Sequence, residues 1–321
     1  MSRPRTMRTN GRAAAAIVVQ GLTRRFGELT AVEDLHFEVA PGGLFGLVGP
    51  DGAGKTTTLR MLAGVLRPTG GDAILAGVSV AKNAENVKHH IAYMSQRFGL
   101  YADLTVRENI DFHADLYSVP RAERPARLER LYRFSNLGPF EKRPAGKLSG
   151  GMKQKLSLCC ALIHQPEILL LDEPTLGVDP ISRRDLWLIL HEMVEQGVTV
   201  LVSTAYMDEA ERCDQVALLD RGRIVALDRP ESLQRSLAGR MLSLRATDAR
   251  RAVQVLSQAA GIRRAALFGD DIHVTLDQSA RDATVLHDAL AGSSIDVSDV
   301  RAIEPSLEDV FMDRVAGGTG S

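Results

Sequence analysis

A glycine-rich octapeptide between an apolar run and a helix-like run constrains the fold of this chain most strongly. Residues 49–56 read Gly-Pro-Asp-Gly-Ala-Gly-Lys-Thr and fit the pattern G-x-x-x-x-G-K-[ST]. The apolar run at 44–48 predicts a buried strand, and residues 56–66 predict a helix. In this strand–loop–helix context the motif forms a phosphate-binding loop.

The residue types of this loop suit an anion that carries several phosphates. Glycines let the backbone curl so that successive N–H groups point at one anion, and the following helix adds the positive end of its dipole. Lys55 would reach the β- and γ-phosphates, and the Thr56 hydroxyl would hold Mg²⁺. A chance match in a glycine-rich turn is the alternative, and the fitting flanks argue against it. The predicted nucleotide-binding residues of the loop are Gly49, Asp51, Gly52, Ala53, Gly54, Lys55, Thr56 and Thr57.

Composition narrows the class of protein. The 321 residues include 39 Lys and Arg against 40 Asp and Glu, so the basic excess of a dominant nucleic-acid role is absent and no nucleic-acid partner is predicted. No apolar run approaches the roughly 18 residues of a membrane span. We therefore expect any membrane-spanning part to belong to another chain. The three cysteines show no metal-ligand spacing and cannot all pair with one another. This cysteine content predicts a reducing, cytoplasmic location.

Strand-like and helix-like runs alternate along the first two thirds of the chain. This alternation predicts an α/β fold with a largely parallel sheet covered on both faces. Helical spacing dominates between about residues 105 and 136, with a break expected near Pro120. The predicted strands, besides 44–48, are 17–19, 35–39, 73–75, 91–94, 168–171 and 198–202.

The composition changes after Pro230, and a second unit begins near Met241. Its predicted order is β-α-β-β-α-β, which suggests a small ferredoxin-like α+β domain. A short helix is expected at 307–315. The predicted strands are 242–246, 262–268, 272–276 and 295–303, and the predicted helices are 249–259 and 280–290. The predicted domains are a basic tail at 1–14, a large domain at 15–235 with a helical subdomain at about 97–147, an accessory domain at 236–316 and a tail at 317–321.

Two acidic residues follow the apolar run at 168–171. A buried strand here would place both carboxylates at its end, facing the phosphate loop. Asp172 would orient Mg²⁺ and its waters, and Glu173 would polarise the attacking water. A helix N-cap is the alternative for such a pair, and the nearby phosphate loop argues against it.

A second glycine corner, Ser149-Gly150-Gly151, precedes another helix-like run. A hydroxyl, bare backbone N–H groups and a helix dipole make an anion site, although a plain N-cap reads the same way. One chain does not need two phosphate sites for one nucleotide. We therefore expect this corner to close on the γ-phosphate held by another subunit.

These motifs, in this order and spacing, resemble the nucleotide-binding subunit of ABC transporters over about residues 15–235. The resemblance implies a P-loop NTPase fold of the ABC type with ATP and Mg²⁺ as its ligands. It implies that Phe26 stacks on adenine and that Gln96 touches Mg²⁺ and the lytic water. It also implies that Ser149, Gly150 and Gly151 form the signature loop, and that Asp179 is the central acid of a loop crossing the dimer seam.

The chain departs from this family at Ala205, where a histidine normally contacts the γ-phosphate. Losing one such donor typically costs about 10²–10³ in rate. Two identical copies would therefore be slow, whereas an unlike partner could complete one site. A low-turnover, nucleotide-gated clamp and a soluble ABC protein outside transport stay open as alternatives.

Residues 99–105, 206–211 and 305–311 are similar to the ATPases of ABC-2 type exporters, which include multidrug and antibiotic exporters. The resemblance implies an ATP-hydrolysing subunit, peripheral on the cytoplasmic face of the inner membrane, that couples dimer closure to a separate membrane permease. The second ATP-binding subunit would be a like or an unlike chain. Nothing in the sequence specifies the cargo. The candidates to receive a permease helix are Phe98, Leu100, Tyr101 and Leu104.

Overall fold

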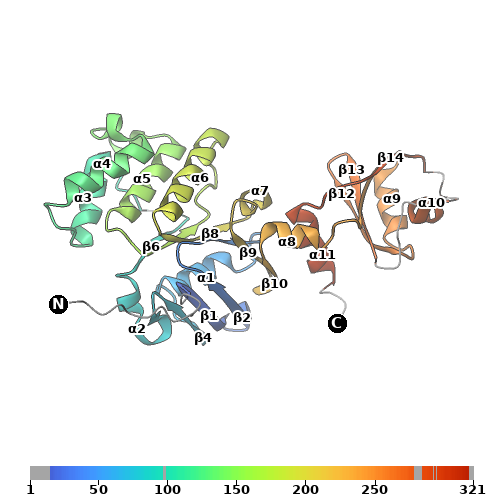
Figure 1. The fold of residues 1–321 in the computed structure, drawn as a ribbon, viewed down its shortest axis with the longest axis horizontal. Coiled ribbons are helices and arrows are strands. Elements are labelled where there is room, and N and C mark those ends of the chain that lie inside the picture. Colours follow the sequence, from blue (N-terminus) through green and yellow to red (C-terminus); the bar gives the residue numbers. More distant parts are fainter. Residues whose placement is uncertain (1–14, 97–98, 278–283, 292, 294, 318–321) are drawn as a thin grey trace, which may run out of the picture. The chain divides into compact units, whose positions relative to one another are not determined.

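The computed structural model describes residues 15–96, 99–277, 284–291, 293 and 295–317 (Figure 1). The described chain divides into two compact units. One comprises residues up to 205 together with 221–223, and the other comprises residues 206–220 and those from 224 onward. The predicted boundary at 235–236 stays a prediction. The predicted tail at 1–14, Phe98 and residues 318–321 lie outside the described residues.

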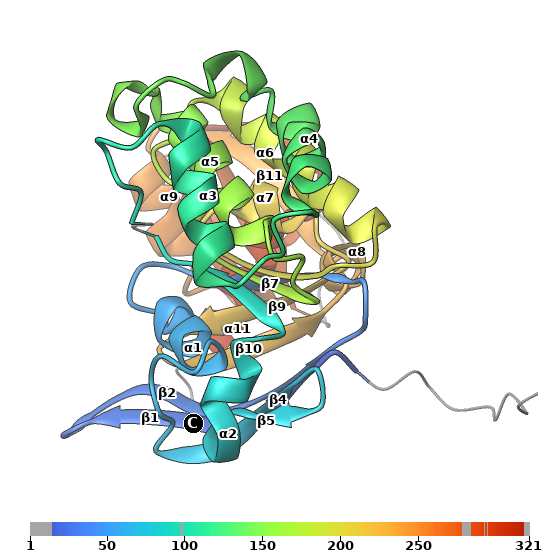
Figure 2. The same ribbon diagram turned by 90° about the vertical axis from the view of Figure 1, so that its left-hand side faces the viewer.

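Parallel strands form the centre of the first unit. They lie in the order β3 (Leu44–Val48), β8 (Thr199–Thr204), β7 (Ile168–Asp172) and β6 (Ile91–Met94). All residues of β3, β7 and β8 are buried, as a parallel sheet covered on both faces requires. Figures 1 and 2 show the two covering layers, which are α5 (Gly150–Leu162) and α6 (Pro180–Glu195) on one face and α1 (Lys55–Leu62) on the other.

A separate antiparallel sheet accompanies the parallel one. Its order is β2 (Leu29–Val39), β1 (Ile17–Phe26), β4 (Gly70–Leu75) and β5 (Val78–Ser79), and α2 (Val80–Val87) follows it. The prediction of one largely parallel sheet was therefore incomplete. The tight turn at Gly27, whose φ is +57°, makes β1 and β2 antiparallel neighbours.

Helix α1 is shorter than predicted. The expected helix ran to residue 66, but it ends at Leu62. Gly64 has a φ of +65°, and a Cβ at this position would lie 3.0 Å from the Cβ of Ala84. The close approach of α2 therefore favours a glycine in the left-handed conformation, which ends the helix.

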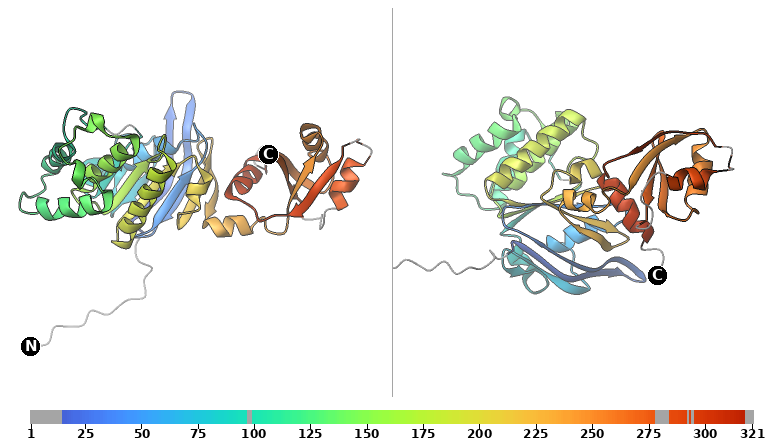
Figure 3. Two further views of the ribbon diagram at one scale, coloured as in Figure 1. Left: turned by 90° about the horizontal axis from the view of Figure 1, so that it is seen from above. Right: turned by 45° about the vertical axis from the view of Figure 1, so that its right-hand side comes forward.

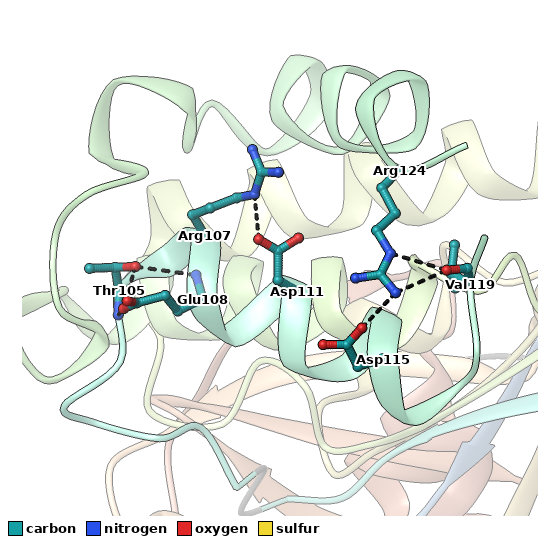
Figure 4. A network of polar contacts seen from close by, with 7 residues as sticks. All are labelled: Thr105, Arg107, Glu108, Asp111, Asp115, Val119 and Arg124. Atoms are coloured by element: carbon teal, nitrogen blue, oxygen red, sulfur yellow. Dashed lines mark hydrogen bonds and ion pairs between the residues drawn. The ribbon is translucent and has the colours of Figure 1, made fainter. Parts of the chain in front are cut away.

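Two helices separated by a turn precede α5. They are α3 (Val106–Leu116) and α4 (Arg124–Ser135), which confirms the break expected near Pro120. Thr105 and Glu108 cap the start of α3 reciprocally, and the guanidinium of Arg124 closes the turn by donating to the carbonyl of Val119 and to Asp115 (Figure 4). Both helices pack on α5.

The second unit contains the predicted β-α-β-β-α-β element order. Four of its strands form an antiparallel sheet in the order β12, β13, β11, β14, with α9 on one face and α11 on the other (Figure 3). This confirms the predicted small α+β fold. The elements are α7 (Met207–Ala210), β9 (Gln215–Asp220), β10 (Arg223–Asp228), α8 (Pro230–Arg235), β11 (Met241–Ala246), α9 (Ala249–Leu256), β12 (Ile262–Phe268), β13 (Asp271–Leu276), α10 (Thr284–Leu290), β14 (Val297–Ala302) and α11 (Leu307–Gly317).

A buried carboxylate joins α11 to the sheet. Nδ1 of His273 donates to one Asp309 oxygen at 2.9 Å, and the hydroxyl and amide of Ser306 donate to the other at 2.7 and 3.0 Å. Burial opposes ionisation, but these hydrogen bonds hold the pKa of Asp309 below its ordinary value of 3.8. Such a carboxylate stabilises the folded state at pH values above its ordinary pKa. This stabilisation is lost as the pH falls through its lower pKa in the folded state.

We expect Asp309→Ala to lower the local opening free energy of amides in β13 and α11 by about 2 kcal/mol at pH 7. The substitution removes the carboxylate that accepts from the Ser306 amide and hydroxyl and from Nδ1 of His273. Hydrogen exchange of the full chain measures this quantity. The difference from wild type should shrink as the pH falls below the ordinary carboxyl pKa. Asp288→Ala, at an exposed position of α10, is the control. An equal difference at pH 7 and in acid would contradict the assignment.

Candidate nucleotide site

The glycine-rich loop closes around the ammonium group of Lys55. Its Nζ donates to the carbonyl oxygens of Gly49 at 2.7 Å and Pro50 at 3.1 Å. Gly54 has a φ of +105°, and a Cβ there would approach the carbonyl oxygen of Ala31 to 2.7 Å, so only glycine fits. Because α1 begins at Lys55, the loop lies at a helix N-terminus, where backbone N–H groups bind anions.

Two carboxylates at the end of β7 face this loop. Oδ1 of Asp172 accepts a hydrogen bond from the Thr56 hydroxyl at 3.0 Å. Oε1 of Glu173 lies 3.0 Å from Nζ of Lys55, and its Oε2 accepts from Nε2 of Gln96 at 3.3 Å. Lys55 and both carboxylates are buried, so the three charges depend on one another and on their hydrogen bonds.

The backbone of Glu173 is strained. Its φ of +49° lies in the left-handed region, which costs a residue with a side chain about 1–3 kcal/mol and persists only where neighbours hold it. Glu173 is the first residue after β7. In this left-handed conformation, the Glu173 carboxylate contacts both Lys55 and Gln96.

Tyr93 on β6 adds a further hydrogen bond to this cluster. Its hydroxyl donates to Oδ2 of Asp172 at 3.4 Å. Burial, together with the charge of Asp172, raises the pKa of Tyr93 to about 12, so the phenol stays protonated and remains a donor. Sequence reasoning missed this residue as part of the site; its place three residues before Gln96 was the available signal.

A cavity of about 360 Å³ lies in front of the loop. Its lining residues include the glycine-rich loop with its backbone N–H groups, Lys55 with its ammonium group and Gln96 with its amide, which suit a phosphate chain, and two acidic residues, Asp51 and Glu173. The lining residues are Ala31, Asp51, Gly52, Ala53, Gly54, Lys55, Thr56, Thr57, Gln96 and Glu173. The structure therefore brings most of the predicted loop residues together with Gln96 and Glu173.

The oxygen donors beside the cavity fit Mg²⁺. The Thr56 hydroxyl and the Asp172 carboxylate are 3.0 Å apart, so one cation could contact both oxygens directly or through water. Among the described residues, no group of three or more His, Cys, Asp or Glu side chains is arranged so that it could hold a metal ion. Mg²⁺ commonly binds one or two carboxylates and completes its shell with phosphates and waters, which this donor set allows.

Comparisons with known proteins identify the family. Residues 32–176 match the family model described as ABC transporter, and residues 229–315 match the one described as ATP-binding protein DrrA1-3-like, C-terminal domain. The chain is 32% identical over 302 residues to the daunorubicin resistance ATP-binding protein DrrA2 of Streptomyces coeruleorubidus, covering 92% of this chain and 94% of that protein. This chain belongs to the ATP-binding subunits of ABC transporters. They are a family of ATPases.

A second relative is larger than this ABC subunit. The probable multidrug ABC transporter ATP-binding protein YbhF of Escherichia coli (strain K12) is 41% identical over 311 residues, which cover 96% of this chain and 53% of that protein. The chain thus spans about half the length of this curated relative. In the part of the chain that the structure describes, no helix combines the length and apolar character needed to cross a bilayer.

Solved structures agree with the predicted fold class. A structure of an ATP-binding subunit of an ABC transporter has a TM-score of 0.63 at 31% identity and covers 69% of this chain and 92% of that chain. The dimeric post-hydrolysis structure of the cassette MJ0796 bound to ADP and Pi has a TM-score of 0.61 at 23% identity, covering 66% and 98%. The second likeness supports the fold alone.

The predicted signature loop of this ABC subunit, Ser149-Gly150-Gly151, does not line the nucleotide cavity. Ser149 caps α5, since its Oγ accepts from the amide of Met152 at 3.3 Å. Gly150 and Gly151 follow in the first turn of α5, and a Cβ on Gly151 would lie 2.2 Å from Oγ of Ser182. The cavity thus contains the phosphate loop and lacks the second predicted anion site.

Asp179 is likewise engaged at a helix start. Its Oδ1 accepts from the amide of Ser182 at 2.9 Å, so it caps α6. This backbone hydrogen bond, with that of the Ser182 side chain, lowers the pKa of Asp179. Asp179 and Ser182 both lie close to Gly151, and Asp179 does not line the nucleotide cavity.

Phe26 and Ala205 are both exposed. Phe26 ends β1, with the guanidinium carbon of Arg24 4.4 Å from its ring centroid, and it does not line the cavity. Ala205 directly follows β8, whose last residue, Thr204, accepts a hydrogen bond from the amide of Gly49 at 3.3 Å. The position of the missing histidine therefore adjoins the phosphate loop.

Proposed function

We propose that this subunit hydrolyses Mg–ATP at a seam between two ATP-binding subunits and that closure of the pair drives an exporting permease. The supporting observation is the separation of two groups of residues. Lys55, Gln96 and Glu173 line one cavity, whereas Ser149 and Asp179 cap helices outside it. One chain would then supply halves of two different sites.

The residues of the proposed site would divide between binding the nucleotide and hydrolysing it. Lys55 would bind the β- and γ-phosphates, and Phe26 would stack on adenine. Thr56, Asp172 and Gln96 would hold Mg²⁺, which neutralises developing phosphate charge. Glu173 would accept a hydrogen bond from the attacking water, and the other subunit would add its signature loop and Asp179. The second subunit is a like or an unlike chain.

A second cavity in the first unit suits a permease helix. Its volume is about 290 Å³, and Gln96 lines both this groove and the nucleotide cavity. Asn109, fully buried, holds the adjoining loop by hydrogen bonds to Tyr101, Leu104 and Thr105. Of the predicted docking residues that the structure describes, only Leu100 lines the groove. Its lining residues are Gln96, Leu100, Ala102, Ala145, Gly146, Lys153, Gln154 and Ser157.

The groove predicts a variant that blocks docking. Ala102 is exposed in its wall, and Ala102→Trp would fill the space that a permease helix needs. We expect co-purification of the permease to fall at least about tenfold, as for loss of a central interface contact. Ala81→Trp, at an exposed position on α2, is the matched control. Undiminished co-purification by Ala102→Trp would exclude this groove.

Reconstitution tests the proposed function. The full chain is captured with its partners from native membranes in detergent, the spanning chain is identified, and the complex is placed in proteoliposomes. We expect the spanning chain to raise ATP turnover and the complex to sit peripherally on the cytoplasmic face. ATP-dependent closure without turnover in the complex would instead favour the nucleotide-gated clamp suggested by Ala205. Recovery only with ribosomes or DNA would overturn a transport role.

A further inference from the structure

A fully buried serine lies behind the two carboxylates. Ser203 is on β8, between β3 and β7, and is paired with Asp172 in the parallel register. It has no exposed surface, while the three residues before it on the strand are apolar. A buried hydroxyl in such a strand needs partners, and its partners indicate what it does.

The Ser203 hydroxyl contacts both acidic residues. Its proton is donated to Oδ1 of Asp172 at 2.8 Å, and its oxygen accepts from the backbone amide of Glu173 at 3.0 Å. The same amide lies 3.2 Å from the carbonyl oxygen of Ser203. A serine hydroxyl has one proton and two acceptor positions, so this group serves consecutive residues of β7 and the turn after it.

These contacts hold the strained turn. Glu173 adopts a φ of +49°, which a residue with a side chain leaves unless its surroundings fix it. Both the hydroxyl and the carbonyl oxygen of Ser203 accept from the Glu173 amide. Relaxation of this turn would move the Glu173 carboxylate away from Lys55 and Gln96.

We propose that Ser203 is a positioning residue for hydrolysis. It aligns Asp172 through the side chain and Glu173 through the backbone, and it does not itself line the nucleotide cavity. The inference rests on the roles proposed above for Asp172 and Glu173. It adds a residue from β8 that sets the geometry of both.

Single-turnover hydrolysis of radiolabelled ATP by the full chain tests this assignment. We expect Ser203→Ala to lower the rate constant about 10- to 100-fold, as loss of an outer hydrogen-bond partner typically does, with ATP affinity within about twofold. Ser203→Thr retains the hydroxyl and should recover most of the rate. Thr199→Val is the matched control. Thr199 is buried at the start of the same strand, away from Asp172, and its hydroxyl accepts a hydrogen bond from the amide of Gly42.

A double variant separates positioning from stability. Because Ser203 would act in part through Glu173, adding Ser203→Ala to Glu173→Gln should lower the rate by a smaller factor than Ser203→Ala alone does. A Ser203→Ala rate close to that of wild type, or a loss no larger than that of Thr199→Val, would overturn the inference. If Ser203→Ala does not fold, Ser203→Cys replaces it, and full activity of that variant is equally contradictory. Full activity of Glu173→Gln would instead refute the role of Glu173.

Discussion

Glu173→Gln is expected to lower ATP turnover by about 10²–10⁴-fold, the usual contribution of a positioned general base. Glutamine keeps the size of the side chain and its approach to Gln96, but it cannot take the proton of water and no longer pairs with Lys55. Nucleotide binding should persist, because the loop that surrounds Lys55 is unchanged. Turnover of the full chain and binding of a fluorescent ATP analogue measure the two effects separately.

Glu167→Gln provides the control for this charge change. Glu167 immediately precedes β7, is exposed and pairs with His90, so it lies at the opposite end of the same strand. Its replacement should leave turnover within about twofold, as for surface substitutions generally. Glu173→Gln that turns over at the wild-type rate would remove the general base from the proposed mechanism.

Ala205→His should raise turnover of the full chain by about 10²–10³-fold, the effect of one added donor to a developing charge. Ala205 is exposed directly after Thr204, which is hydrogen-bonded to Gly49 of the phosphate loop. The new imidazole would therefore extend from a segment that already adjoins the loop. Steady-state turnover at saturating Mg–ATP measures the gain.

The matched control for this gain is Ala205→Leu, which adds bulk without a hydrogen bond and should stay slow. An equal gain from both variants would attribute the effect to packing. A wild-type chain that already turns over as fast as Ala205→His would show that residue 205 does not limit hydrolysis. It would also remove the main reason to expect an unlike partner subunit.

Local pattern was sufficient for much of the fold. The strand before the phosphate loop, the break near Pro120 and the β-α-β-β-α-β order of the second unit were predicted, because apolar spacing and turn residues act over a few neighbours. The separate sheet of β1, β2, β4 and β5 was not predicted. Its pairing of β1 with β4 joins segments far apart in the chain, with Ile17 opposite Leu75.

The sequence predicted the motif residues of the site, but it did not predict the other residues that form hydrogen bonds with them. The motif indicated Lys55 and Glu173, but nothing local indicates that they pair at 3.0 Å. Tyr93 and Ser203 were missed because their significance comes from Asp172, which lies 79 and 31 residues away. The available signal for Ser203 was a polar residue directly after three apolar residues, 200–202, of a buried strand.

Gln96 lines both the nucleotide cavity and the groove beside α5. A small molecule bound in that groove would therefore contact Gln96, a residue of the proposed hydrolytic site, without occupying the space of ATP. Its inhibition would not be relieved by more ATP. A compound bound there would slow the proposed hydrolysis without displacing ATP.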